Sequence, residues 1–355
     1  MTLSRRSILY LVSLLVLSVA LFRWRTTLKN LLSRRQTVLP VQTKFPNHFT
    51  EGDKALVSLV RGDNVDQTVR EAIDLIGGIE KLAVNGKTVL LKPNVVSGEP
   101  SPTTTNPEVI GAVIKLVKQA GARKVYVGDM SALLTLPTRK NMERTGILKV
   151  TEEIGAEPVF FEDHNWVKID LPQAEYLREA YVSEWIYKAD RVINLPVIKT
   201  HRSATYSLCL KNFIGATHGR QRPYLIDASH WEEIIADLNL AYQPHLNIVD
   251  GTKAMVSGGP WSGAVEKTGI ILASGDRIAA DIIGLALIKH FGKARDVTGK
   301  GVWEQRQIKR AIEFGLGAKG YDSILLKYKS LMPQDSGFTR LIASIEKHAR
   351  DGTKR

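Results

Sequence analysis

The chain has 355 residues, 44% of them hydrophobic and 24% charged, which is enough to bury one large core or two modest ones. This composition excludes an extensively disordered or low-complexity protein. The single cysteine, Cys209, excludes an internal disulfide framework and an iron–sulfur cluster ligated by this chain. Its neighbours Leu208 and Leu210 indicate that it is a small buried hydrophobe. Beyond that exclusion, the sequence leaves the cofactor unknown.

The formal net charge of +13 is unevenly distributed along the chain. Seven basic residues lie in the first 35 positions, and no acidic residue precedes Glu51. A basic segment beside an apolar one is typical of a membrane surface. No recognition helix, zinc finger or aromatic-basic stripe accompanies it. We therefore expect a membrane to be a partner through the N-terminus, and we expect no nucleic acid.

Residues Ser7 to Phe22 form an uncharged, almost wholly apolar stretch that directly follows Arg5 and Arg6. The stretch is shorter than the roughly 20 residues of a transmembrane helix, and Ser18-Val19-Ala20 offers the small residues of a signal-peptidase site. The paired arginines loosely resemble a twin-arginine export signal. If the segment is retained, the basic residues after it favour a cytoplasmic main domain. We predict a signal peptide or membrane anchor over 1–22, with cleavage and membrane side left open.

The remainder of the chain divides into a linker, a main domain and a tail. A basic linker is expected over 23–50, where two prolines interrupt any continuing helix. From Ala55 onwards, short β-branched runs alternate with segments of helical period. This alternation predicts an α/β fold with a mainly parallel, doubly wound sheet and crossover helices, preceded by the N-terminal apolar helix. The α/β domain is expected over 51–330, with a C-terminal helix and basic tail over 331–355.

Local signals place individual elements of this domain. The expected strands lie at 88–91, 124–127, 191–194, 246–249 and 270–273. Asn106 is a good N-cap for a helix that Gly121 would end. Ser229 and Glu232 have the spacing of a capping box before another helix. A further helix is expected to follow Asp276.

Polar residues stand at the carboxyl end of each expected strand. In chain order they are Lys92, Asn94, Asp129, Asn194, Lys199, His201, Asp250 and Asp276. In open α/β sheets, ligands bind beyond the carboxyl ends of the strands. One such residue often only stabilises a turn. Five successive strands with polar ends therefore indicate one common site.

Two loops could add backbone groups to this site. The loop Gly98 to Asn106 is rich in small hydroxyls, including Thr105, and leads to a helix N-terminus that could hold phosphate or carboxylate. Gly258 and Gly259 belong to a second loop, where the backbone could approach a ligand. That loop matches neither the Walker nor the dinucleotide fingerprint. A plain turn remains an alternative for both loops.

The densest polar chemistry lies at Lys199 and His201, and at Lys211 with Asn212. Lysine and histidine so close together can bind an anion, transfer a proton or supply one metal ligand. The histidine spacing matches no compact zinc motif, so whether a metal binds stays open. A histidine that makes hydrogen bonds at the rim of a site is the simpler alternative.

These stretches resemble the family known as domain of unknown function 362. The likeness rests on motifs in the same order over roughly 89–287. They are Leu91-Lys92-Pro93-Asn94, Gly121-Ala122 with Gly128-Asp129, Ile193-Asn194-Leu195-Pro196 with Lys199-Thr200-His201, Leu210-Lys211-Asn212 with Gly215, and Asp250-Gly251 with Gly258-Gly259-Pro260. The resemblance implies a fold and a site location rather than a reaction. Some members carry ferredoxin-type cysteine clusters, from which this chain departs, and export-like N-termini occur among relatives.

The sequence thus leaves two main functional hypotheses and a third, structural one. The first is an enzyme acting on an anionic small molecule, and the second is a membrane-tethered protein that binds a ligand or cofactor without catalysis. The third is a partner-binding protein whose polar crevice is incidental. The expected catalytic residues are His201, Lys199, Asp129 and Asp250. The expected ligand-binding residues are Lys92, Asn94, Thr105, Asn194, Lys211, Asn212, Gly258, Gly259 and Asp276.

Overall fold

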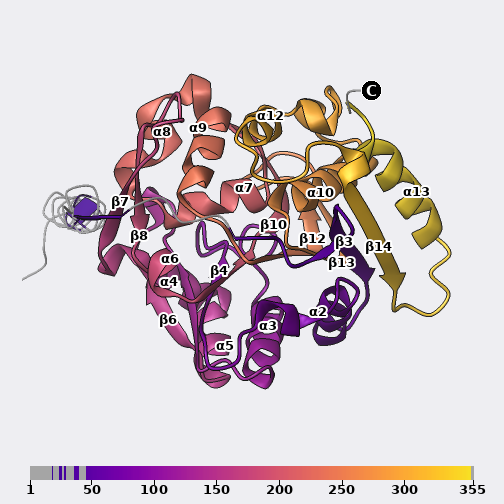
Figure 1. The fold of residues 1–355 in the computed structure, drawn as a ribbon, viewed down its shortest axis with the longest axis horizontal. Coiled ribbons are helices and arrows are strands. Elements are labelled where there is room, and N and C mark those ends of the chain that lie inside the picture. The colour runs from indigo at the N-terminus through magenta and orange to yellow at the C-terminus, as the bar shows by residue number, and fades with distance from the viewer. Residues whose placement is uncertain (1–17, 19–23, 26–27, 29–35, 40–44, 353–355) are drawn as a thin grey trace, which may run out of the picture.

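An eleven-stranded sheet runs through the centre of the molecule (Figure 1). The structure is a computed structural model that describes residues 18, 24–25, 28, 36–39 and 45–352. Apart from Ser18, the predicted apolar segment 7–22 lies outside these residues, as does most of the predicted linker. Within the described part, none of the helices combines the length and the apolar character that crossing a membrane requires.

The main path of the sheet has the order β14-β3-β13-β12-β9-β4-β5-β6. These strands are Ile324–Ser330, Lys54–Arg61, Val265–Ser274, Leu246–Met255, Arg191–Leu195, Thr88–Pro93, Lys124–Asp129 and Glu157–Phe160. Every neighbouring pair on this path is parallel except the two pairs that contain β13. Shorter strands extend the sheet, namely β2 (Thr50–Glu51), β10 (Val197–His201) and β11 (Thr205–Ser207).

Helices cover both faces of the sheet, as Figure 1 shows. One face carries α2 (Val65–Asp74), α3 (Pro107–Gln119), α4 (Thr138–Thr145) and α5 (Ile147–Glu153). The other carries α7 (Cys209–Asn212), α9 (Trp231–Leu238), α10 (Arg277–Phe291), α12 (Arg306–Glu313) and α13 (Phe338–Ala349). The short helices α6, α8 and α11 span Trp185–Lys188, Pro223–Ile226 and Arg295–Thr298.

Alternate residues of the strands separate two buried cores, because successive side chains of a strand point to opposite faces. On β3, Leu56 and Val60 join the core beneath α2 and α3, whereas Val57 and Leu59 join the core beneath α10. Strands buried on both faces need nearly continuous apolar sequence, which is what the sequence of β3 and β4 provides. The predicted α/β class with a mainly parallel, doubly wound sheet is confirmed.

A second, three-stranded sheet packs beside the main one. It contains β1 (Gln36–Val38), β7 (Trp166–Asp170) and β8 (Glu179–Ser183). Trp166, Ile169 and Val182 join the same core as α10. The sequence analysis did not predict this sheet, because its strands are short and two of them form a hairpin with a long connection.

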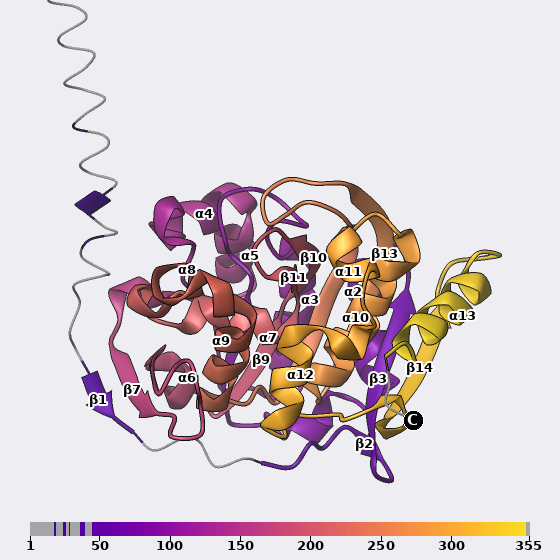
Figure 2. The same cartoon turned by 90° about the horizontal axis from the view of Figure 1, so that it is seen from above.

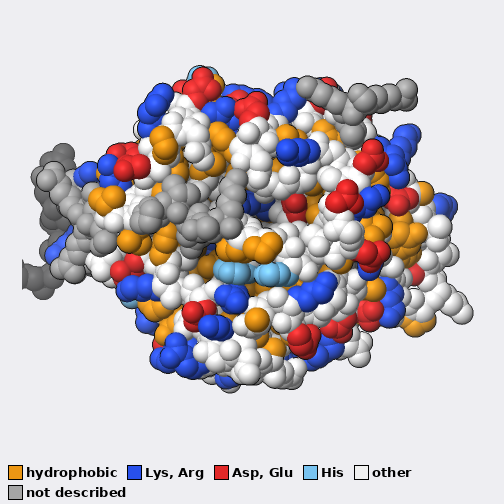
Figure 3. Space-filling view, viewed as in Figure 1, with side chains coloured by type: hydrophobic (Ala, Val, Ile, Leu, Met, Phe, Trp, Pro, Cys, Tyr) orange, Lys and Arg blue, Asp and Glu red, His pale blue; other side chains and the backbone are white. Residues whose placement is uncertain are grey.

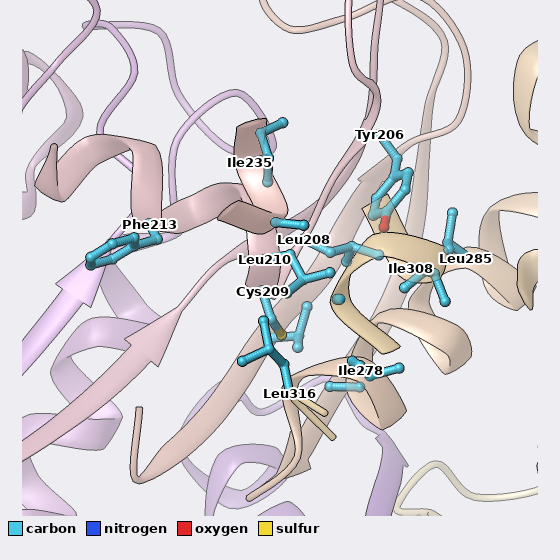
Figure 4. Close-up of a cluster of buried hydrophobic side chains, with 14 of the residues drawn as sticks. Tyr206, Leu208, Cys209, Leu210, Phe213, Ile235, Ile278, Leu285, Ile308 and Leu316 are labelled. Atoms are coloured by element: carbon cyan, nitrogen blue, oxygen red, sulfur yellow. The ribbon is translucent and has the colours of Figure 1, made fainter. Parts of the chain in front are cut away.

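Helix α7 is fixed onto α10 by a buried carboxylate. Asp281 accepts hydrogen bonds from the backbone nitrogens of Cys209 (2.7 Å) and Leu210 (3.2 Å). Cys209 is fully buried in the apolar cluster of Figure 4, as its neighbours in the sequence predicted. A side chain at Gly284 would meet Leu208, so this glycine allows the close approach of α7 to α10. The position of α7 matters because Lys211 and Asn212 belong to it.

Several predicted helix ends are as expected and one is wrong. Asn106 caps α3 through a hydrogen bond from the Glu108 nitrogen, and Asp276 caps α10. The capping box at Ser229 does not form, because the Ser229 hydroxyl and nitrogen both bind Asp227. Helix α9 instead begins at Trp231, without a side-chain cap.

The two edges of the sheet differ in what they carry. Figure 2 shows α4, β10 and β11 toward one edge and β2 toward the other.

Figure 3 shows a face of the molecule on which basic and acidic side chains of the described residues are intermixed. On that face the described residues form no broad patch of a single charge.

We predict that Asp276→Ala destabilises the fold through the start of α10. Its Oδ1 atom accepts hydrogen bonds from the nitrogens of Ile278 and Ala279, and Oδ2 accepts one from Ala318. Loss of such a cap lowers the free energy of unfolding by about 1–2 kcal/mol, which urea denaturation measures. The control Asp66→Ala removes an exposed ion pair with Lys115 and should change the free energy of unfolding by about 0.5 kcal/mol or less. Equal effects of the two variants would contradict the prediction.

Candidate functional site

A cavity of about 390 Å³ lies beyond the carboxyl ends of β4 and β5. The turn between β10 and β11, helix α7, and the segments around α8 and α9 form its other walls. Its polar lining consists of Asn94, Asp129, His201, Arg202, Ser203, Ser207, Lys211, Asn212, Arg222 and Ser262. Its apolar and aromatic lining includes Met130, Leu133, Leu134, Ile214, Tyr224, Trp231, Pro260 and Trp261. A mainly apolar cavity with a few convergent polar groups is the usual form of a small-molecule site.

A buried ion pair forms the floor of this cavity. Lys92 Nζ lies 2.7 Å from Asp129 Oδ1, and both side chains are almost completely buried. The second oxygen of Asp129 accepts a hydrogen bond from the Val95 nitrogen at 2.7 Å. Burial lowers the pKa of Lys92, and the carboxylate of Asp129 opposes that shift. The pair joins the ends of β4 and β5, from which both residues come.

Gly215 allows the segment after α7 to approach this ion pair. A side chain at Gly215 would collide with Asp129 Oδ1 and would meet Lys92 Nζ at 2.7 Å. The Gly215 carbonyl also accepts a hydrogen bond from the Met130 nitrogen at 3.1 Å. Only glycine fits there without displacing the pair. The glycine of the Lys211-Asn212-Gly215 motif is therefore explained by its close approach to Lys92 and Asp129.

A row of buried amides continues from Lys92 across the sheet. Strand register places Lys92 beside Asn194 and Asn194 beside Asn247. Asn194 donates to Asn247 Oδ1 (3.0 Å) and accepts from Asn212 Nδ2 (2.8 Å). Asn212 also donates to the Lys92 carbonyl at 3.1 Å. The row fixes α7 against the strands, and of its members only Asn212 lines the cavity.

Lys199 and Thr105 hold the hydroxyl-rich loop rather than the cavity wall. Lys199 Nζ donates to the Thr103 carbonyl at 2.6 Å, and Thr103 in turn donates to the Trp261 carbonyl at 3.2 Å. Thr105 accepts from the Asn94 nitrogen and donates to the Leu195 carbonyl, both at 2.8 Å. Burial lowers the pKa of Lys199 well below its ordinary value, and the charge of Lys211 adds to the effect. These bonds fix the loop over the ends of β4 and β9.

His201 lines the cavity as a neutral ring. Its Nδ1 atom accepts hydrogen bonds from the nitrogens of Ser203 and Ala204, each at 3.2 Å. The ring proton is therefore assigned to Nε2, which leaves an N–H donor. Burial lowers the pKa of His201 well below its usual value, and the nearby charges of Lys211 and Lys199 lower it further. At neutral pH the ring can donate a hydrogen bond without carrying a charge.

Lys211 and Arg222 are the two inner cationic groups of the cavity. Lys211 is partly accessible, and its side-chain amine makes no hydrogen bond or ion pair with any other described residue. Burial lowers its pKa to about 7, with Arg222 and Lys92 adding repulsion. Arg222 donates from Nη2 to the Met130 carbonyl at 3.3 Å, while its buried Nε has no partner in the described structure. Trp231 Nε1 is likewise buried and unpartnered there.

The structure places Asp250 and Asp276 away from this cavity. Asp250 is buried on the opposite face of the sheet, because the alternation of β12 points it toward α3. Its oxygens accept from the Asn106 nitrogen (2.8 Å) and from Thr252. Asp276 follows β13, which runs antiparallel to its neighbours, so this strand's carboxyl end points to the other edge. Gly258 belongs to the same loop but does not line the cavity, whereas Gly259 does.

Of the predicted site residues, the structure therefore brings Asn94, Asp129, His201, Lys211, Asn212 and Gly259 together around the cavity, with Lys92 directly beneath. The sequence analysis missed Arg202, Arg222, Tyr224, Trp231 and Trp261. Arg202 adjoins His201 and Trp261 adjoins the glycine loop, so proximity to a motif could have indicated both. Arg222 precedes α8, Tyr224 lies in α8 and Trp231 begins α9, and none of the three belongs to a recognisable sequence pattern. Among the described residues, no three His, Cys, Asp or Glu side chains are grouped in a way that could hold a metal ion.

Three comparisons bear on this architecture. Residues 89–286 match the family described as Domain of unknown function (DUF362). The thylakoid-associated protein sll1697 of Synechocystis sp. is 30% identical over 239 residues, which cover 64% of this chain and 72% of that protein. The lactate racemase apoprotein from Thermoanaerobacterium thermosaccharolyticum is similar over 71% of this chain and 60% of its own, with 13% identity and a TM-score of 0.41.

We predict that Lys92→Met is strongly destabilising, because it leaves the Asp129 carboxylate buried without its cation. Removing one partner of such a pair lowers the free energy of unfolding by about 3–5 kcal/mol. The double variant Lys92→Met/Asp129→Asn should lose less than the single variant, since no unpaired charge remains. Urea denaturation of both variants measures the difference. A double variant that is less stable than Lys92→Met alone would refute the buried-charge explanation.

Proposed function

The chain belongs to the family described as Domain of unknown function (DUF362), as its motifs predicted, and we propose that its cavity binds a small anionic molecule with an apolar or aromatic part. The observation that carries this proposal is the excess of positive charge in the lining. Arg202, Lys211 and Arg222 line the cavity, and the one carboxylate among the lining residues, Asp129, is already paired with Lys92. An anion would compensate this charge.

Unpaired donors on residues that line the cavity support the same proposal. Buried polar groups in folded proteins almost always have a hydrogen-bond partner. Arg222 Nε and Trp231 Nε1 have none, and the Lys211 amine has neither a hydrogen bond nor an ion pair in the described structure. A carboxylate, sulfonate or phosphate could accept from such groups. The aromatic rings of Tyr224, Trp231 and Trp261 would contact the apolar part of the same ligand.

The residues reaching the cavity can also support catalysis. His201 offers a neutral N–H donor, and the pKa of Lys211 is lowered to about 7, so its amine can both accept and release a proton near neutral pH. In this proposal Lys199 and Asp250 are positioning residues, since they bind the backbone of Thr103 and Asn106. An accessory protein that binds the ligand without changing it is the alternative. Recovery of a chemically unchanged ligand from the purified full chain would favour that alternative.

We predict that the full chain binds benzenesulfonate, an aromatic anion whose charge does not change with pH, more tightly than benzyl alcohol. Arg222→Met should weaken binding about 10–100-fold, the worth of one charged hydrogen bond. The control Arg123→Met removes an exposed arginine that binds Thr88 outside the cavity and should have no effect. Calorimetric titration measures the affinity of the unchanged chain for both probes and the affinity of each variant for benzenesulfonate. Equal affinity for the two probes would rule out an anion site.

The same titration should depend on pH through Lys211. The charged or titratable groups that interact with it are Arg222, Lys92, Lys199 and His201. Its pKa of about 7 makes Lys211 cationic below that value, whereas the lowered pKa of His201 keeps that ring neutral. Affinity for benzenesulfonate should therefore rise as the pH falls from 8 to 6, and this rise should be absent in Lys211→Met.

We further propose that the protein is associated with a membrane and that the cavity mouth faces it. The basic, apolar N-terminal sequence supports this, and the Synechocystis relative is named as thylakoid-associated. Leu134 (80% exposed), Trp261 (51%) and Tyr224 (42%) line the cavity and are also exposed at the surface of the protein. Leu225 and Ile226 are exposed beside them on α8. Exposed apolar side chains with the neighbouring Arg202 are suited to an anionic lipid surface.

Tryptophan fluorescence tests this orientation. Bromine on lipid chains quenches tryptophans that enter the bilayer interface, where tryptophan is favoured. In the full chain carrying Trp24→Phe, vesicles of brominated anionic lipid should quench the fluorescence, and Trp261→Phe should remove most of that quenching. The matched variant Trp185→Phe, which changes a tryptophan outside the cavity lining, should retain it. Quenching that is unaffected by Trp261→Phe would show that the cavity mouth does not face the membrane.

A further inference from the structure

We propose that Lys211 is a nucleophile that forms an imine with the carbonyl carbon of an anionic aldehyde or 2-oxo acid bound in the cavity. This inference rests on the proposed anion-binding function and names the substrate class of that site. It concerns one amine among the three lysines nearest the cavity. The other two, Lys92 and Lys199, are both occupied by hydrogen bonds.

The contacts of the three lysines distinguish their roles. Lys92 is held by Asp129 and by the Pro93 carbonyl, and Lys199 by the Thr103 carbonyl. Lys211 lines the cavity, and no described residue accepts a hydrogen bond from it or pairs with it. An amine that is accessible and uncommitted is the one that can attack a ligand. An anion-holding lysine would need only charge, whereas a nucleophile needs a free lone pair.

The surroundings of Lys211 supply that lone pair. Arg222 and Lys92 lie near it, and no carboxylate pairs with it, so burial and repulsion both disfavour the ammonium form. Its pKa of about 7 means that a substantial fraction of the Lys211 amines is neutral at pH 7. At an ordinary lysine pKa of about 10.4, only roughly one in 2,500 would be. A second cation beside a desolvated lysine is a known way to activate it for imine formation.

Neighbouring groups match the other atoms of such a substrate. Arg222 also lines the cavity and can bind the carboxylate of a 2-oxo acid. His201 can donate its Nε2–H to the carbonyl oxygen, because its Nδ1 is already an acceptor of two backbone hydrogen bonds. The cavity therefore offers a nucleophile, an oxygen-stabilising donor and an anion holder, from α7, β10 and the residue preceding α8.

The proposed step balances without any further reagent. The Lys211 nitrogen bonds to the carbonyl carbon, and the π electrons of the carbonyl move onto its oxygen to give a carbinolamine after proton transfer. The carbon–oxygen bond then breaks as the nitrogen lone pair forms the carbon–nitrogen double bond. The two hydrogens of the neutral amine leave with that oxygen as water. No oxidant or reductant is consumed.

Reductive trapping of the full chain tests the inference. Phenylglyoxylate, an aromatic 2-oxo acid, is added with cyanoborohydride at pH 7, and the reduced adduct is located by peptide mass spectrometry. We expect modification of Lys211 to exceed that of exposed lysines such as Lys115 about tenfold or more, given its larger neutral fraction.

Variants separate this inference from the proposed function. Lys211→Arg keeps a positive charge but lacks the nucleophile, so it should lose the adduct. Its affinity for benzenesulfonate, measured by calorimetric titration, reports separately on whether the anion site is intact. Lys115→Arg should keep the adduct. If benzenesulfonate binds but labelling is spread over surface lysines, the imine inference is overturned while the anion site stands. If neither probe binds, both proposals are overturned.

Discussion

The ion pair between Lys92 and Asp129 is the constraint on which the candidate site depends. It joins the ends of β4 and β5, and it leaves room above it only for a glycine, at position 215. That glycine follows α7, so the pair also sets how closely the helix carrying Lys211 approaches the sheet. A buried ion pair contributes little net stability once desolvation is counted. Its value here lies in the position it gives to the backbone around it.

The neutralisation of Asp129 also determines the charge of the cavity. If Asp129 were unpaired, its carboxylate would offset one of the cationic side chains in the lining. Because Asp129 is paired with Lys92, it forms no ion pair with Arg202, Lys211 or Arg222 in the described structure. Unpaired cations next to buried donors are unfavourable in the absence of a ligand. Groups of this kind persist mainly where binding or chemistry requires them, which is why perturbed lysine and histidine pKa values mark functional sites.

The sequence predicted elements whose signals are local. Strands β4, β5 and β9 have continuous apolar runs, and α3 has its cap, its proline and its terminal glycine within one short segment. Membership of the site was harder to predict, because it depends on strand direction and parity. Asp276 follows a strand that runs the other way, and Asp250 points to the other face of a strand that runs the right way. Neither fact can be read from composition or motif spacing.

Strand parity also explains why the polar residues on the two faces of the sheet support different segments of the site. Lys92, Asn194 and Asn247 occupy one row and face α7 and α10, so their polar groups support the helix from which Lys211 projects. Asp250 faces α3 and binds the start of that helix, so it secures the loop whose Thr103 carbonyl engages Lys199. Lys199 is thereby committed to holding the loop. Of the two lysines in the adjacent motifs, Lys211 alone remains available to a ligand, and this difference follows from the backbone that each one meets.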